Sequence, residues 1–140
     1  MKKLFFTMML LAVAGVLSAE NILVTVHISG LTVGGGSVFI AVQNEENADN
    51  KIEEPFFSDM ITPTSANIDY TVELPADNYM FFIFQDTNNN GQLDANLFKI
   101  PKEPVGMSNY DFKSIPGSFS KHKVAVSAEN NHVDIAVRKF

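Results

Sequence analysis

Apolar residues at every second position are the feature that most constrains how this chain can fold. Residues 22–29 and 66–74 carry apolar side chains at every second position, which is the period of a strand with one buried face. In residues 37–42, Val38, Ile40 and Val42 share one face, and Phe39 and Ala41 lie on the other. Residues 79–84 are almost continuously apolar, as expected for a central strand covered on both faces. Because three glycines, at 34–36, separate the runs at 22–29 and 37–42, we expect those runs to form a hairpin.

The rest of the chain supports the same fold class. Residues 44–58 are acidic and predict an ordered excursion with one short helical turn, and 96–117 contain too many Pro and Gly residues for a long helix. We therefore expect an ordered loop at 96–117, followed by two closing strands at 121–127 and 132–140 that meet at a turn. About seven short strands and no long helix predict an all-β fold, an antiparallel Greek-key β-sandwich.

The N-terminal 19 residues have the pattern of a secretory signal peptide. Lys2 and Lys3 precede an apolar run that is short for a bilayer span, and Ser18 and Ala19 provide a cleavage site. We expect one domain at 20–140, exported to the periplasm or released as an extracellular protein; a retained N-terminal anchor is the alternative. The sequence has no cysteine, so neither a disulfide nor a lipid-modified Cys contributes.

Charge argues against one class of partner. The full sequence has a net charge of −6, and without Lys2 and Lys3 eight Lys or Arg residues face sixteen Asp or Glu, a net −8. Such an acidic chain lacks the positive charge that holds phosphate backbones, so we do not expect nucleic-acid binding.

Residues 86–97 resemble the loop of an EF-hand in the order of their oxygen-bearing side chains. Asp86, Asn88, Asn90 and Asp94 alternate, the Gln92 carbonyl takes the position of a backbone ligand, and Gly91 stands where such a loop turns sharply. This order predicts a Ca²⁺ site, with Asn96 or Glu103 available to complete it.

Two features of this loop keep a second interpretation open. Leu97 replaces the bidentate Glu at the twelfth position, and the flanking segments have strand patterns and not helical ones. With only Asp86 and Asp94 charged, we expect a dissociation constant of roughly 10⁻⁴ to 10⁻³ M. Alternatively, the Asn and Asp side chains only cap turns by bonding their own backbone.

Other motifs point away from catalysis. The chain has no cysteine nucleophile, no Gly-x-Ser-x-Gly element and no phosphate-binding loop, so we do not expect an enzyme. His27 and His132 fall on polar strand faces and His122 at the start of a strand, which does not predict a zinc site. Residues 98–109 directly follow the Asp loop and form either a ligand cleft or a loop packed on its own side chains.

Several elements carry a resemblance to known proteins. The turn 74–79, Leu-Pro-Ala-Asp-Asn-Tyr, is similar to the Leu-Pro-x-Gly-x-Tyr turn of transthyretin-like (prealbumin-like) sandwiches. The elements Asp-x-Asn-x-Asn-Gly-x-Leu-Asp at 86–94 and Pro-Lys-Glu-x-x-Gly-x-Ser-Asn at 101–109 resemble the exported bacterial family of domain of unknown function 2141. That resemblance implies export and a β-sandwich, and it implies no activity.

Three functions are compatible with these observations. The first is a non-catalytic binding module that takes an unknown protein or small ligand at its loop end, stiffened by Ca²⁺. The second is an envelope structural or assembly protein that pairs through edge strands. The third, a carbohydrate-active enzyme, requires paired acid and base groups that the sequence does not indicate.

Overall fold

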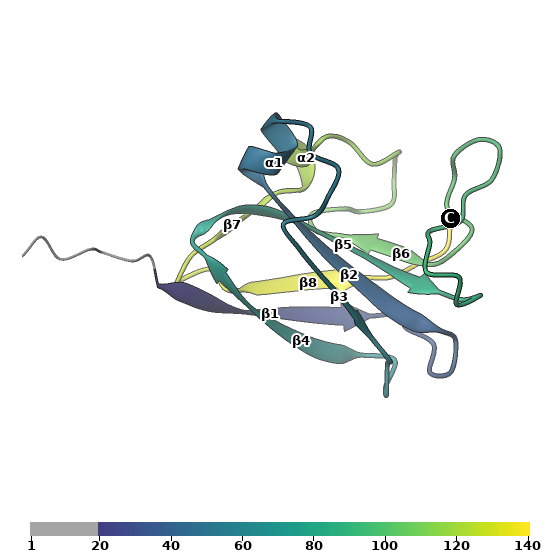
Figure 1. Cartoon of the computed structure of the whole chain (residues 1–140). Helices are drawn as coiled ribbons and strands as arrows, with labels where there is room; N and C mark the ends of the chain where they lie inside the picture. The colour runs from purple at the N-terminus through teal and green to yellow at the C-terminus, as the bar shows by residue number, and fades with distance from the viewer. Residues whose placement is uncertain (1–19) are drawn as a thin grey trace, which may run out of the picture.

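Two β-sheets pack face to face in the computed structural model, which describes residues 20–140 (Figure 1). The expected signal peptide at 1–19 lies outside the described residues. The first sheet has the order β4 (Ile68–Pro75), β1 (Asn21–Ser29) and β8 (His132–Ala136). Strands β1 and β4 are antiparallel, whereas β1 and β8 are parallel, with Val26 opposite Val133.

The second sheet has the order β3 (Phe57–Ile61), β2 (Ser37–Asn44) and β5 (Asp77–Asp86). The other edge of β5 is shared by β6 (Val105–Met107), beside its C-terminal half, and β7 (Val124–Val126), beside its start. Two short helices, α1 (Glu45–Asp49) and α2 (Phe119–His122), lie above this sheet in Figure 1. The expected all-β sandwich is confirmed, and so is the single helical turn in 44–58.

Alternate residues of both sheets meet in one core. Tyr79, Phe81 and Ile83 of β5 point inward, and the cluster draws its other members from strands of both sheets. The aliphatic side chains with no exposed surface are Val24, Val26, Ile28, Val38, Ile40, Val42 and Ile83. Burial of these side chains is the main force that stabilises a sandwich without disulfides.

The expected hairpin between the first two strands is wrong. Strand β1 lies in the first sheet between β4 and β8, and β2 lies in the second. Gly30, at φ +80°, lies so close to the backbone of Val137 that an added Cβ would be 2.3 Å from the Val137 carbonyl oxygen. The next residue, Leu31, buries its side chain in the core, and its backbone N–H donates a hydrogen bond to the Ala66 carbonyl. Both edges of β1 are already paired, so β2 has no place beside it.

The closing strands also differ from expectation. Residues 119–122 form α2, which leaves only three residues for β7, and β8 ends at Ala136. These two strands belong to different sheets, so the turn between them connects the sheets.

The sequence patterns did not predict two of the strands, β3 and β6. In β3 an acidic residue, Asp59, shares the face of Phe57 and Ile61, and its carboxylate accepts a hydrogen bond from the Tyr70 hydroxyl at 2.7 Å. This charge at an inward position hides the alternation. Strand β6 has only three residues, too few for a period to show.

The corner between β4 and β5 is closed by a tyrosine. The Tyr79 hydroxyl donates to the Pro75 carbonyl oxygen at 2.7 Å, while its ring is buried in the core. Burial, and then the nearby Asp77 carboxylate, raise the pKa of Tyr79 to about 12. No helix within residues 20–140 has both the length and the apolar character needed to cross a membrane.

Candidate functional site

The loop that follows β5 is built on a buried carboxylate. Asp86 is buried at the end of the strand, and its two oxygens accept the backbone N–H groups of Asn90 (3.2 Å) and Gly91 (2.7 Å). Asn89 and Gly91 adopt positive φ angles of 52° and 75°, which Asn and Gly tolerate better than other residues. Asp86 therefore folds the loop around itself.

Three of the expected Ca²⁺ ligands converge in this loop. The Asp94 carboxylate accepts the side-chain amide of Asn88 at 2.5 Å and that of Asn90 at 3.0 Å. The amide nitrogens of both Asn residues thus face the carboxylate. A cation at this point would require the amides to turn their oxygens inward, because Ca²⁺ is held by oxygen ligands.

The other expected ligands have different partners. Gln92 donates its N–H to the Asn90 side-chain oxygen at 3.0 Å, and the Asn96 side chain caps the N–H groups of Phe98 and Ile100. Within residues 20–140, no three His, Cys, Asp or Glu side chains are grouped so that they could hold a metal ion. A cation here would therefore depend on amide and carbonyl oxygens in addition to carboxylates.

Glu103 fixes the Asp loop to the segment that follows it. Its side chain is only 2% exposed, and its two oxygens accept the N–H groups of Thr87 (3.0 Å) and Asp94 (3.2 Å). The sequence suggested Glu103 as a further metal ligand and gave no sign of this structural role. The Lys102 N–H adds a bond to the Asp94 carbonyl at 2.8 Å.

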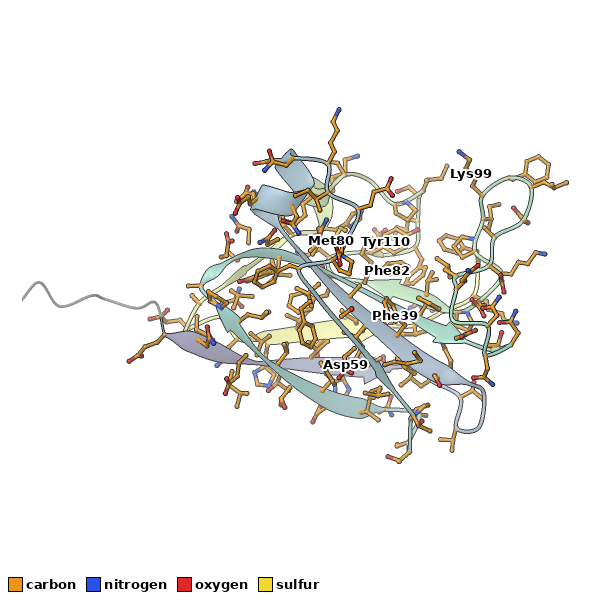
Figure 2. The ribbon with its side chains drawn as sticks, in the orientation of Figure 1. Phe39, Asp59, Met80, Phe82, Lys99 and Tyr110 are labelled. Atoms are coloured by element: carbon orange, nitrogen blue, oxygen red, sulfur yellow. The ribbon has the colours of Figure 1, made fainter. Side chains whose placement is uncertain are left out.

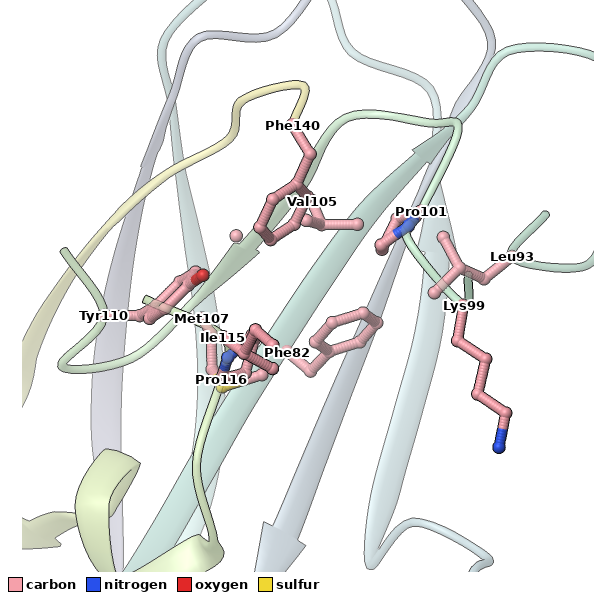
Figure 3. A pocket seen from close by; sticks show the side chains of 11 residues that line it. Phe82, Leu93, Lys99, Pro101, Val105, Met107, Tyr110, Ile115, Pro116 and Phe140 are labelled. Carbon is pink, nitrogen blue, oxygen red and sulfur yellow. The ribbon is translucent and has the colours of Figure 1, made fainter. Parts of the chain in front are cut away.

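Two adjoining cavities lie beside this loop. The smaller, about 280 Å³, extends to Phe82 of β5 and Met107 of β6 on the outer face of the second sheet (Figure 3). The larger, about 620 Å³, lies between the loop at 98–101 and the loop at 112–116. The residues that line both are Lys99, Pro101, Ile115, Pro116 and Phe140. We call the two together the loop-end cleft.

An aromatic cluster forms one wall of the loop-end cleft. The Phe112 ring lies 4.6 Å from that of Tyr110 and 5.9 Å from that of Phe140, measured between centroids. On the same ring, the Arg138 guanidinium carbon is 5.2 Å from the centroid. This contact between a cation and a ring face is attractive and holds Phe112 in place.

The apolar surface continues beyond the cleft. Phe39, Met80 and Phe82 lie on the outer face of β2 and β5 (Figure 2) and line a groove of about 320 Å³. Phe82 borders both this groove and the smaller cavity of the loop-end cleft. The long apolar run of β5 is thus partly explained by this outer face, which loops cover only in part.

The histidines have structural partners. His122, expected at the start of a strand, is instead buried in α2; its Nε2 accepts the Gly117 N–H at 2.8 Å and its Nδ1 donates to the Asn109 carbonyl at 3.1 Å. His27 pairs with Asp69 across β1 and β4 at 2.6 Å. His122 therefore supports the loop at 109–117, which forms part of the cleft.

Comparison with known proteins gives one assignment. No curated protein and no solved structure matches the chain. A family model matches residues 26–134, which are most of the chain and include both the Asp loop and nearly all of the loop-end cleft. The chain therefore belongs to the DUF2141 family of uncharacterized proteins conserved in bacteria.

Proposed function

We propose that this protein is an exported, non-catalytic binding module that takes a small ligand or a protein partner at the loop end of its sandwich. The loop-end cleft carries this proposal. Its total extent is typical of ligand sites, which are concave, mostly apolar and about 300–1,000 Å³. Loops that project from a rigid sheet are also where binding residues concentrate.

The pattern of the N-terminus supports export, as argued from Lys2, Lys3 and the apolar run. The chemistry of the cleft favours binding over catalysis. Its lining is mostly aromatic and aliphatic, with Lys99, Lys113, Ser114 and Tyr110 as polar members, and it contains no Asp, Glu, His or Cys to pair with them as acid, base or nucleophile.

A fragment screen tests the binding role. Amide NMR signals of the 15N-labelled protein would be followed while cationic, neutral and anionic compounds, each alkyl or aromatic, are added separately. We expect at least one class to shift the signals of 98–101 and 112–116 in a saturable way. If no class does so, the binding role at this end is wrong.

We further propose that Ca²⁺ binds weakly in the Asp loop and stiffens the neighbouring cleft. The convergence of Asn88 and Asn90 on Asp94 supports this, because three oxygen-bearing side chains already meet at one point. Glu103 would transmit the stiffening, since it bonds the Asp loop on one side and belongs to the 98–104 segment on the other.

A thermal melt tests the cation site. With a dissociation constant of about 1 mM, 10 mM CaCl₂ should stabilise the protein by about 1.4 kcal/mol relative to excess EDTA. The melting temperature should rise by a few degrees, and 10 mM MgCl₂ should have a smaller effect.

Asp94→Asn is the better variant for this test, since Asp86→Ala would also remove the acceptor for two backbone N–H groups. It should abolish the Ca²⁺ response, and Asp134→Asn, which neutralises an exposed carboxylate of β8, should retain it. An unchanged response in Asp94→Asn would rule out the site.

A further inference from the structure

Positive charge is concentrated in one part of this acidic chain. Residues 20–97 contain one lysine and twelve Asp or Glu residues, a net side-chain charge of −11. Residues 98–140 contain seven Lys or Arg residues and four Asp or Glu residues, a net +3. The loop-end cleft is built almost entirely from this second part. Of the lysines in this second part, Lys99 and Lys113 line the larger cavity and would attract an anion there.

Two lysines stand at the cleft itself. Lys99 and Lys113 line the larger cavity, and Figure 3 shows the Lys99 side chain extending away from the apolar groups, so that its ammonium lies at the outside of the group. Asp111, two positions before Lys113, does not line either cavity, and its carboxylate accepts the Lys113 N–H at 3.0 Å. Neither lysine has a carboxylate within salt-bridge distance in the described residues.

The interior of the cleft offers an apolar path. Pro101 and Ile115 line both cavities, and Phe82 and Met107 of the sheet line the smaller one. Ile115 is 89% exposed and Phe98 is 84% exposed, so large apolar side chains face solvent at the entrance. Exposed apolar groups beside a cavity indicate a surface that a ligand covers.

The backbone is strained at two of these positions. Lys99 and Phe112 both adopt φ +61°, a left-handed conformation that is unfavourable for a non-glycine residue. For a bulky residue such as Phe112 this conformation is rare. Strain of this kind is common where residues are held for a ligand, and here it occurs at one lysine and at the aromatic wall of the same cleft.

We propose that the loop-end cleft binds an amphiphile that has one alkyl chain and an anionic head group, as a fatty acid has. The carboxylate lies between Lys99 and Lys113, and the alkyl chain runs past Ile115 toward Phe82. This proposal names the ligand class for the binding role proposed above and rests on it.

Titration calorimetry with sodium dodecanoate, below its micelle concentration and at pH 8, tests the proposal. We expect saturable binding of one molecule per protein. Decanoate should bind roughly fifteenfold more weakly, because each buried methylene contributes a factor of about four. Dodecyltrimethylammonium, which has the same chain and the opposite charge, should bind at least tenfold more weakly than dodecanoate.

Two variants, each with a matched control, locate the site. Ile115→Asp places a negative charge at the entrance and should abolish binding; because Ile115 is largely exposed, the fold should be retained. Val33→Asp changes another exposed apolar residue, 58% exposed and outside the cleft, and should bind normally. Lys99→Gln with Lys113→Gln should weaken binding about tenfold, whereas Lys51→Gln, in the acidic part, should not.

The same anionic chemistry occurs in free fatty acids and in membrane lipids. Co-sedimentation with vesicles of phosphatidylglycerol distinguishes the sources: binding to free dodecanoate alone assigns a soluble acid, and sensitivity of vesicle binding to Ile115→Asp assigns a lipid. Either result supports the proposal.

Absence of binding in both arms, or equal affinity for the cationic amphiphile, overturns the proposed ligand class. The fragment screen then decides the rest. If a neutral or cationic fragment shifts the amide signals of 98–101 and 112–116, the binding role holds and only the ligand class is wrong. If no fragment shifts these signals, both the binding role and the ligand class are wrong.

Discussion

The two ends of β5 are held in different ways. At its start, the Tyr79 hydroxyl bonds the Pro75 carbonyl only four residues away. At its end, Asp86 opens a loop that depends on Glu103, which bonds Thr87 from sixteen residues away. The first end is a compact corner between the sheets, whereas the second opens into a cleft with strained and exposed side chains. The comparison indicates that a local contact fixes the closed end of β5, whereas a contact from a more distant residue positions the loop at its open end.

The largest loss of stability is expected from a substitution of Glu103 at the loop end. Glu103→Ala removes the acceptor of two part-buried N–H groups and should lower the free energy of unfolding by roughly 3 kcal/mol. Urea unfolding measures the loss. Glu129→Ala, in the turn before β8, should stay within about 0.5 kcal/mol of the wild type. A Glu103 variant as stable as the Glu129 variant would show that the loop does not depend on this contact.

The corner at the other end should respond less. Tyr79→Phe removes one hydrogen bond and keeps the buried ring, so it should cost about 1 kcal/mol at pH 7. A cost equal to that of Glu103→Ala would remove the contrast between the two ends.

The same residue makes a prediction about alkaline pH. Because the pKa of Tyr79 rises from 10.0 to about 12 on folding, the folded protein keeps this proton where the unfolded chain loses it. Its contribution to stability is therefore complete below pH 10 and is lost as the pH rises toward 12. Tyr79→Phe should make that fall shallower. Some fall should remain, since burial and the Asp59 contact also raise the pKa of Tyr70.

The smallest effect concerns strain in the cleft. Lys99→Gly relieves a positive φ and should leave stability unchanged or raise it by about 0.5 kcal/mol. Lys113→Gly, at a position without positive φ, should lower stability by about the same amount. Thermal melts of the two variants measure the difference, and equal losses would show that position 99 carries no strain.

The sequence predicted the parts of the molecule that depend on local pattern. Alternation located β1, β2 and β4, and the apolar run located β5, because each strand repeats the same contact with the core. The convergence of Asn88, Asn90 and Asp94 was also predictable, since these residues lie within a few positions of one another.

Other features depend on distant residues and gave no local signal. The parallel pairing of β1 with β8 joins residues more than a hundred positions apart. The charged Asp59 interrupts the apolar pattern of β3, and the residue that makes this inward position favourable, Tyr70, lies in the opposite sheet. The loop-end cleft is lined by residues that are distant in sequence, from Phe82 to Phe140. The sequence therefore indicated only that the segment after the Asp loop could form part of a ligand cleft.

The most direct test of the account is an intermolecular NOE experiment on the 15N- and 13C-labelled protein with dodecanoate. We expect contacts from the alkyl protons of dodecanoate to the side chains of Ile115, Phe112 and Phe140. These contacts should disappear in Ile115→Asp. Contacts to exposed apolar residues elsewhere, such as Leu23 or Met60, would contradict the claim that the loop end is where this protein binds its ligand.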